Sequence, residues 1–194
     1  MTVRVIEEGK FREIRGYLWH CLAVFRPGID IPVFEAPREF CGELTGVNFD
    51  GFTLIIEEGR RQLDRQDSQL ERQRTRAATL VTVALAELAL LSNGARASFR
   101  SGWPITTAWV VSAGIVLFGL AGAIAVLTGK AVIGRTDTQA IASKPNRRLA
   151  AISYAEASTI GECTVAARLT VLRDAVLLLV LGALVYAAVW PWKN

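Results

Sequence analysis

Hydrophobic residues are gathered into three long runs, and polar residues occupy most of the chain between them. The runs cover residues 77–95, 105–128 and 175–192. At 1.5 Å per residue the first run corresponds to about 28 Å, close to the thickness of the hydrocarbon layer of a bilayer. The second run has no charged residue, and the first has only Glu87. A buried helix of a soluble protein seldom contains so many consecutive apolar residues, so the pattern predicts three transmembrane helices.

The polar stretch before the first span, residues 53–76, lacks proline and is rich in Arg, Gln, Glu and Leu, which favour a helix. Apolar residues recur at steps of seven and continue into the span: Ile56, Leu63, Leu70, Ala77, Ala84 and Leu91. A step of seven is typical of a coiled-coil contact, although only one apolar position per heptad is filled. A packing contact and a solvated linker helix therefore both stay open for residues 53–76.

Residues 130–174 form a second polar stretch, between the second and third spans. Residues 130–146 contain a Lys144-Pro145-Asn146 turn and are typical of an irregular segment. The apolar positions over 147–174 recur at helical spacing and predict an amphipathic helix. We expect this helix to lie beside the 53–76 helix on the cytoplasmic side of the membrane.

Residues 1–52 are predicted to form a small cytoplasmic region, with a short strand over 2–6 and a helix over 11–25. The helix has an apolar face formed by Phe11, Ile14, Leu18, Cys21, Leu22 and Phe25. This face could lie on the inner leaflet or pack on the cytoplasmic helices, and we expect the second. The sequence thus predicts an all-α membrane protein, with three transmembrane helices, cytoplasmic helical extensions and a small mixed N-terminal region.

The distribution of positive charge predicts the orientation in the membrane. Residues 60–76 contain six arginines and residues 130–148 contain five lysines or arginines, whereas the loop expected at 96–104 contains only two arginines. The N-terminus is therefore expected in the cytoplasm and the C-terminus outside the cell's inner (plasma) membrane. Four tryptophans fall at the same outer level, as interfacial tryptophans do: Trp103, Trp109, Trp190 and Trp192.

The charge and motif content exclude several classes of function. The net charge is +4, but the basic residues flank the spans and are interrupted by acidic ones, so nucleic acid is not expected as a partner. The three cysteines form no paired motif, and there is one histidine. Neither a phosphate-binding loop, a dinucleotide fingerprint nor a zinc-protease motif is present. We expect no catalytic residues, no metal site and no cofactor, and infer that the chain is not an enzyme.

The most informative single position is Glu87, inside the first span. A carboxylate near the bilayer centre costs about 2.5–3.5 kcal/mol on insertion scales, so it should face the interior of a helix bundle. Ser112 and Tyr186 fall at a similar depth in the other two spans. We expect Glu87 to hydrogen-bond to one of them, or to the same residue of a neighbouring subunit. It would then belong to an ion path or hold the helices together.

Small residues in the second and third spans predict close helix packing: Gly114, Gly119, Gly122 and Gly182. Such residues let helix backbones approach one another, within a chain or between copies of it. Their presence is consistent with a homo-oligomer.

The segment RRQLDRQDSQLERQRTRAATLVTVALAELALL, residues 60–91, resembles the entry into the first span of small bacterial transmembrane effectors of antiphage defence. These include the effectors of cyclic-nucleotide (Pycsar-type) systems and the SLATT-type effectors. In both, a charged helix with a Leu-Asp step, here Leu63-Asp64, runs into a membrane hairpin, here residues 77–128, and a cytoplasmic helix follows, here residues 147–174. The resemblance covers about half of the chain and implies an oligomer that disrupts the membrane.

Two functions follow as hypotheses. The first is an oligomerising, pore-forming defence effector, because three spans per subunit cannot enclose a pore alone. The alternative is a non-catalytic membrane scaffold or accessory subunit, whose helices at 53–76 and 147–174 recruit a cytoplasmic protein partner. In either case the bilayer itself is a partner.

Overall fold

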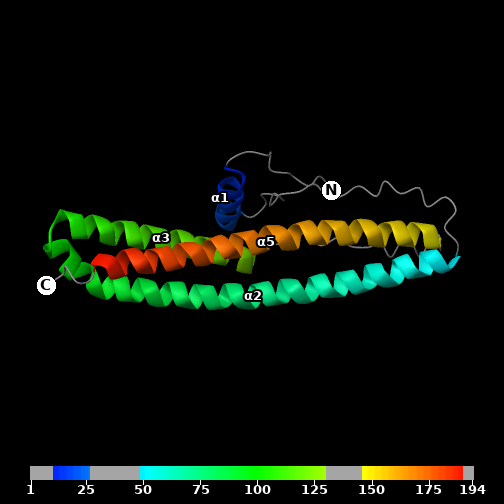
Figure 1. The fold of residues 1–194 in the computed structure, drawn as a ribbon, viewed down its shortest axis with the longest axis horizontal. Coiled ribbons are helices and arrows are strands. Elements are labelled where there is room, and N and C mark those ends of the chain that lie inside the picture. Colours follow the sequence, from blue (N-terminus) through cyan, green and yellow to red (C-terminus); the bar gives the residue numbers. More distant parts are fainter. Residues whose placement is uncertain (1–10, 27–48, 130–145, 190–194) are drawn as a thin grey trace.

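The computed structural model describes residues 11–26, 49–129 and 146–189. Within them the chain forms helix α1 (Arg12–Phe25), α2 (Phe49–Arg100), α3 (Trp103–Thr128) and α5 (Arg147–Val189) (Figure 1). The predicted all-α class is therefore confirmed for these residues. The strand expected at 2–6, and all but Asn146 of the irregular segment expected at 130–146, lie outside them.

Two very long helices set the length of the molecule. α2 runs without a break for 52 residues and α5 for 43, so each joins a predicted cytoplasmic extension to the predicted span that follows it. They lie side by side and run in the same direction (Figure 1). Arg147 donates a hydrogen bond to the Thr53 hydroxyl near the start of both helices, and Gln73 bonds to the Val165 carbonyl further along.

α3 returns antiparallel along the second part of α2 only (Figure 1). The prediction of a loop over 96–104 is wrong, because α2 continues to Arg100. Only Ser101 and Gly102 separate α2 from α3. Gly102 has a φ of 102°, which favours glycine, and Pro104 fits the first helical turn, where its missing N–H has no helical partner to lose. This tight turn explains why few residues are needed between the two helices.

The buried face of α2 consists of two sets of positions, each repeating every seven residues. One set is Leu70, Ala77, Ala84, Leu91 and Ser98. The other begins with Gly59, Gln66 and Gln73. The predicted repeat is confirmed from Leu70 onward, whereas Ile56 and Leu63 are only half buried. Residues 53–76 therefore make a packing contact with α5. In each heptad of this segment, a second buried position is filled by glycine or glutamine, which the pattern of apolar residues did not identify.

The first parts of α2 and α5 form a two-helix stalk, defined here as residues 49–76 and 147–174. Gln66 Nε2 donates to the Ser158 carbonyl at 2.7 Å, and Gln73 Nε2 donates to the Val165 carbonyl at 3.1 Å. Both glutamines are almost fully buried. The two predicted extensions thus pack side by side, as expected, through polar side chains bonded to the neighbouring backbone.

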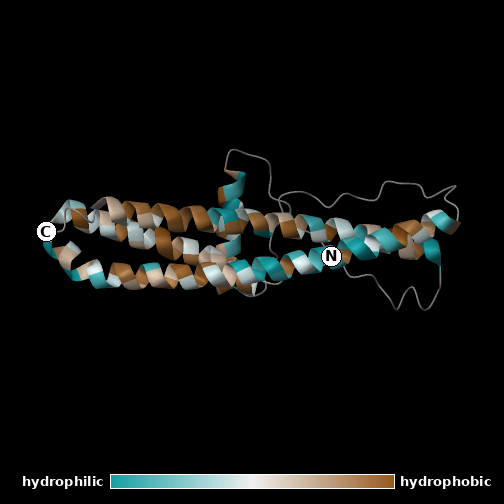
Figure 2. Ribbon diagram, turned by 60° about the horizontal axis from the view of Figure 1, so that its bottom comes forward, coloured by the Kyte–Doolittle hydropathy of each residue, from teal (hydrophilic) through white to brown (hydrophobic). Residues whose placement is uncertain are grey.

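The remaining parts of the long helices pack with α3 into an apolar bundle, defined here as residues 77–128 and 175–189. α2, α3 and α5 are each long and apolar enough to cross a membrane, and only 22%, 39% and 28% of their most apolar windows is buried. Many large apolar side chains are exposed on its outside, for example Leu85, Leu90, Leu117, Leu177 and Leu184. Figure 2 shows this change from a polar stalk to an apolar bundle along the same two helices. Exposed apolar surface of this extent marks an interface with lipid or with another protein.

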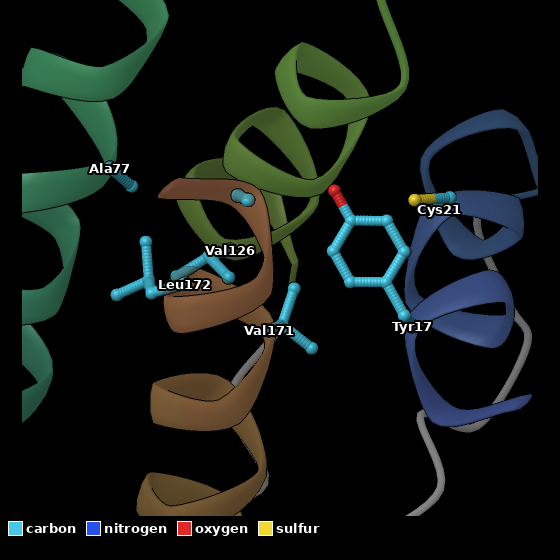
Figure 3. Close-up of a cluster of buried hydrophobic side chains, with 7 residues drawn as sticks. Tyr17, Cys21, Ala77, Val126, Val171 and Leu172 are labelled. Atoms are coloured by element: carbon cyan, nitrogen blue, oxygen red, sulfur yellow. The ribbon is translucent and has the colours of Figure 1, made fainter. Parts of the chain in front are cut away.

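α1 lies across the long axis of the bundle, near the C-terminal end of α3 (Figures 1 and 2). Its Tyr17 and Cys21 pack into a buried cluster with Ala77, Val126, Val171, Leu172 and Ala175 (Figure 3). The cluster therefore joins all four helices of the described chain at the level where the stalk meets the apolar bundle.

Candidate functional site

The polar residue predicted to matter most, Glu87, lies half buried in the apolar bundle. Its Oε2 atom is buried and has no hydrogen-bond partner among the described residues. The expected bond from Ser112 is not made, because the fully buried Ser112 hydroxyl donates to the Gly182 carbonyl at 2.7 Å. Tyr186 lies at the edge of the cluster around Ala84. A bond between Glu87 and Tyr186, or between Glu87 and a neighbouring subunit, stays a prediction.

Glu87 occupies the same heptad position of α2 as two buried glutamines of the stalk. It lies fourteen residues after Gln73 and twenty-one after Gln66, so it occupies the same heptad position. In the stalk, this position faces α5 and the glutamines donate to its backbone. Glu87 occupies this position in the apolar bundle, where a carboxylate has no N–H to donate. Its buried Oε2 atom has no hydrogen-bond partner among the described residues, as is also true of the Oε1 atoms of Gln66 and Gln73.

Two of the predicted packing glycines lie between α3 and α5. A Cβ at Gly119 would lie 3.1 Å from Leu179 Cδ2 and 3.2 Å from the Ala175 carbonyl oxygen, and a Cβ at Gly182 would lie 2.5 Å from Val116 Cγ2. At these two positions the backbone of α3 or α5 lies close to the neighbouring helix, as the small residues predict. Both lie where α3 and α5 approach closely, and Ser112 bonds across the same contact.

The other two predicted glycines behave differently. Gly114 has no atom of another described helix within 4 Å of its Cβ position. Gly122 contacts α1 rather than a span, because the Tyr17 ring lies directly over it. The neighbour of Gly122 is thus α1 rather than another span, and helix packing at Gly114, which would have to be between copies, stays a prediction. The pattern of spans alone does not reveal that α1 occupies the surface at Gly122.

The contact of α1 with α3 and α5 is called the α1 junction here. The Tyr17 hydroxyl donates to the Phe118 carbonyl at 2.9 Å, and the Tyr17 and Phe118 ring centroids are 5.0 Å apart. Figure 3 shows the Tyr17 hydroxyl directed at α3 and the Cys21 sulfur beside it. On the α5 side, Arg173 donates to Glu13 at 2.8 Å, which adds an exposed ion pair to the docked contact. Burial raises the pKa of the Tyr17 hydroxyl, so it stays protonated and able to donate.

Two buried cationic or titratable groups lie at the α1 junction. His20 is 1% exposed, its Nδ1 is 2.8 Å from the Gly16 carbonyl oxygen, and its Nε2 has no partner within the described chain. Arg168 of α5 is 2% exposed and donates to the Gly129 carbonyl at the end of α3. Burial, opposed by the Gly16 contact and assisted by the charge of Arg168, lowers the pKa of His20. Burial, and then the charge of Arg74, lowers the pKa of Arg168 to about 10.

These electrostatics have a clear structural role at the end of α3. The last carbonyls of a helix lack intrahelical donors and carry a partial negative charge, which a cation stabilises. Arg168 supplies both a donor and a charge there. His20 beside it is favoured in its neutral form, because a second positive charge would be buried next to Arg168.

A groove of about 380 Å³ lies between α2 and α5 at the border of the stalk and the apolar bundle. Its walls are largely apolar, with Leu80, Leu172 and Val176, and its polar rim includes Arg76 and Arg173. Arg173 also holds Glu13 of α1. The border between polar and apolar surface is therefore marked on both long helices by an arginine, as at the edge of a membrane.

The sequence reasoning missed Tyr17, His20 and Arg168. It placed Cys21 on one apolar face with Phe11 and Phe25, whereas Cys21 is docked and the other five members of that face are exposed. The available signal was a second face of α1, Gly16-Tyr17 with His20-Cys21, repeating at a spacing of four. For Arg168, the signal was its heptad position between Gly161 and Ala175, both small and both buried.

No family model matches the chain, and no curated protein and no solved structure matches it. Function must therefore be argued from the residues and their geometry.

Proposed function

We propose that the chain is a three-span protein of the inner membrane whose copies assemble and permeabilise the bilayer, as the resemblance to antiphage effectors implies. The spans are the three parts of the apolar bundle. The stalk lies in the cytoplasm, and the turn at Ser101-Gly102 faces outward. The arginines of residues 60–76 support this orientation, because positive charge next to a span stays on the cytoplasmic side. Trp103, 77% exposed beside that turn, supports an outer interfacial position.

The observation that carries the proposal is the unpaired Oε2 atom of Glu87 inside the apolar bundle. An ionisable group inside a membrane segment is costly, so it usually faces water, a partner or a substrate path. In the single chain Glu87 Oε2 has no partner among the described residues, and Ser112 is bonded to Gly182. A second copy of the chain, or water between copies, would solvate it.

The packing of the single chain also supports an assembly. The interior of the apolar bundle is filled by Ala84, Leu91, Val116 and Leu179, all almost fully buried, so no channel runs through one copy at this level. A path for ions would have to lie between copies, bordered by Glu87 from each.

The proposal is tested by inducing the protein in bacteria and following membrane potential with a voltage-sensitive dye. Wild type and Glu87→Gln are compared with Glu87→Leu at equal amounts of protein in the membrane fraction. We expect wild type to depolarise the cells, Glu87→Gln to do so more weakly, and Glu87→Leu to leave the potential unchanged. Glu71→Gln, an exposed stalk position, is the matched control and should behave as wild type. Depolarisation by Glu87→Leu equal to that of wild type would remove Glu87 from the path.

A second candidate function is a membrane scaffold that recruits a cytoplasmic protein, and the stalk favours it. The stalk extends about 42 Å beyond the apolar bundle at 1.5 Å per residue, and its outward positions include Arg61, Asp64 and Asp67, all exposed. Replacing these three residues by alanine separates the two functions. A scaffold would lose its cross-linked partner, whereas a pore formed by the spans would still depolarise the cell.

A further inference from the structure

α1 exposes a continuous apolar stripe although it is docked on the bundle. The exposed side chains are Phe11 (66%), Ile14 (56%), Leu18 (43%), Leu22 (51%) and Phe25 (78%). Their spacing of three and four residues places them on one side of the helix. The docked residues, such as Tyr17 and His20, occupy a different side. The expectation that the apolar face packs on the cytoplasmic helices is therefore wrong, and the stripe has no cover among the described residues.

The position of α1 along the bundle coincides with the expected inner surface of the membrane. Tyr17 and Cys21 pack at the level of Ala77 on α2 and Ala175 on α5. At this level both long helices change from polar to apolar (Figure 2). The helix lies across the bundle axis, which is the orientation of a helix lying in the plane of the membrane (Figure 1). Phe118 of α3, which contacts Tyr17, is itself 38% exposed, so α1 docks beside the apolar outer surface of the spans.

The charges of α1 complement an anionic surface. Arg15 and Arg26 are exposed, on the side of the helix that is neither docked nor apolar. The carboxylate of Glu13 is paired with Arg173. A helix with one apolar side and one basic side binds at the headgroup layer, and more strongly where lipids are anionic.

We propose that α1 lies in the headgroup layer of the cytoplasmic leaflet, with its apolar stripe inserted among acyl chains and Arg15 and Arg26 bound to anionic phospholipid headgroups. The inference rests on the proposed crossing of the membrane, but not on pore formation. The contact between Tyr17 and Phe118 keeps α1 docked at this level of the bundle. The docked helix is therefore already positioned at the leaflet surface.

The test uses full-length protein in lipid vesicles, with an environment-sensitive NBD label on single introduced cysteines. Cys41 and Cys163 are replaced by serine. Cys21 is retained, because it is buried and burial raises its pKa to about 11, which keeps it unreactive near neutral pH. The label is placed at Leu22→Cys on the stripe, at Ala23→Cys on the adjoining side of α1, and at Val110→Cys on the exposed surface of α3. Leu18→Cys is a second stripe position, should labelling at residue 22 disturb folding.

The expected result is blue-shifted emission at residues 22 and 110, quenched by doxyl-labelled lipid at least threefold more than at residue 23. Doxyl phosphatidylglycerol should quench residue 22 more than doxyl phosphatidylcholine does, by up to roughly fivefold per arginine. Arg15→Gln together with Arg26→Gln should abolish this preference.

Three outcomes would overturn the inference, and they are distinguishable. If residue 110 is in lipid but residue 22 is as water-exposed as residue 23, α1 does not lie on the leaflet. If residue 22 cross-links to residue 22 of another copy and is not quenched, a second copy covers the stripe instead. If both lipids quench residue 22 equally, the arginines do not bind anionic headgroups. Water exposure at residue 110 would contradict the membrane crossing itself.

Discussion

The stalk and the apolar bundle are built on the same two helices in one continuous register, yet they are held together differently. In the stalk, Gln66 and Gln73 fill the contact between α2 and α5 and bond to backbone carbonyls. In the apolar bundle, Ala84, Gly119 and Gly182 bring the backbones together, and the large apolar side chains point outward. In water, apolar side chains are buried between helices. In lipid they are not driven inward, so small residues occupy the contacts.

The border between these two regions lies at the same level on every element. Arg76 precedes Ala77 on α2, Asp174 precedes Ala175 on α5, and α1 docks at this level. A single seven-residue repeat therefore continues from the polar stalk into the apolar bundle, and only the type of residue at each heptad position changes.

Gly182→Leu should disrupt the apolar bundle most strongly. Its Cβ alone would lie 2.5 Å from Val116 Cγ2, and the added side chain must separate α3 from α5. Overpacking of a tight contact costs about 1–3 kcal/mol or more, so the free energy of unfolding in detergent should fall by at least that amount. Gly114→Leu is the matched control, since its Cβ position is open. Equal loss of stability in both variants would contradict the assigned α3–α5 contact.

Gly122→Ala should release α1 while leaving the spans packed. An added Cβ would overlap the Tyr17 ring and break the bond from the Tyr17 hydroxyl to Phe118. Loss of one hydrogen bond of this kind is worth about 0.5–1.5 kcal/mol, which corresponds to up to about a tenfold increase in the undocked fraction. The rate at which the Cys21 thiol reacts with a maleimide reports this fraction, in a Cys41→Ser, Cys163→Ser background. Gly114→Ala should leave the rate unchanged.

Acidification should weaken the same docking contact through His20. Its pKa is lowered in the docked state from its ordinary value of 6.5, so the undocked state binds the proton more tightly. Docking is therefore strongest above pH 6.5 and is lost progressively as the pH falls below it. The groups facing His20 are the Gly16 carbonyl and Arg168, and neither can accept a proton in this range. Reactivity of Cys21, corrected for thiolate fraction, should rise by at most about tenfold per pH unit, and His20→Gln should remove that dependence.

Gln66→Leu should have the smallest effect. The substitution removes the 2.7 Å bond to Ser158, but it also removes a buried Oε1 atom that has no partner among the described residues. Because these two changes oppose each other, the free energy of unfolding should change by less than about 1 kcal/mol. Gln66→Glu is the informative companion, since a buried carboxylate facing the Ser158 carbonyl should be clearly destabilising. A large loss in Gln66→Leu would mean that the polar contact itself holds the stalk.

Much of the fold follows from sequence periodicity, because long amphipathic or apolar runs such as 105–128 and 147–174 allow only helices. The steps of seven from Leu70 to Leu91 correctly identify the buried face of α2. What periodicity could not give is the contribution of polar residues to that face. Gln66 and Gln73 can be buried because each side chain donates a hydrogen bond to a backbone carbonyl of α5. Those partners exist only once α2 is paired with α5.

The candidate site was less predictable for the same reason. Glu87 was identified by the cost of a charge among apolar neighbours, which is a local property. The partner of Ser112 was not, because the Gly182 carbonyl is made accessible only by the close approach of α3 to α5. The role of Gly122 depended on α1, whose docked side carries Tyr17 and His20 rather than its most hydrophobic residues.

The crossing of the membrane with the stalk in the cytoplasm is tested most directly by cysteine accessibility. Single cysteines replace Arg65 in the stalk and Leu85, Leu117 and Leu184 on the exposed sides of the three spans. A membrane-impermeant maleimide is applied to intact spheroplasts and to inverted vesicles. We expect residue 65 to react only in inverted vesicles, and residues 85, 117 and 184 to react in neither preparation until detergent is added. Reaction of all three span positions in intact membranes, or of residue 65 from outside, would contradict the proposed topology.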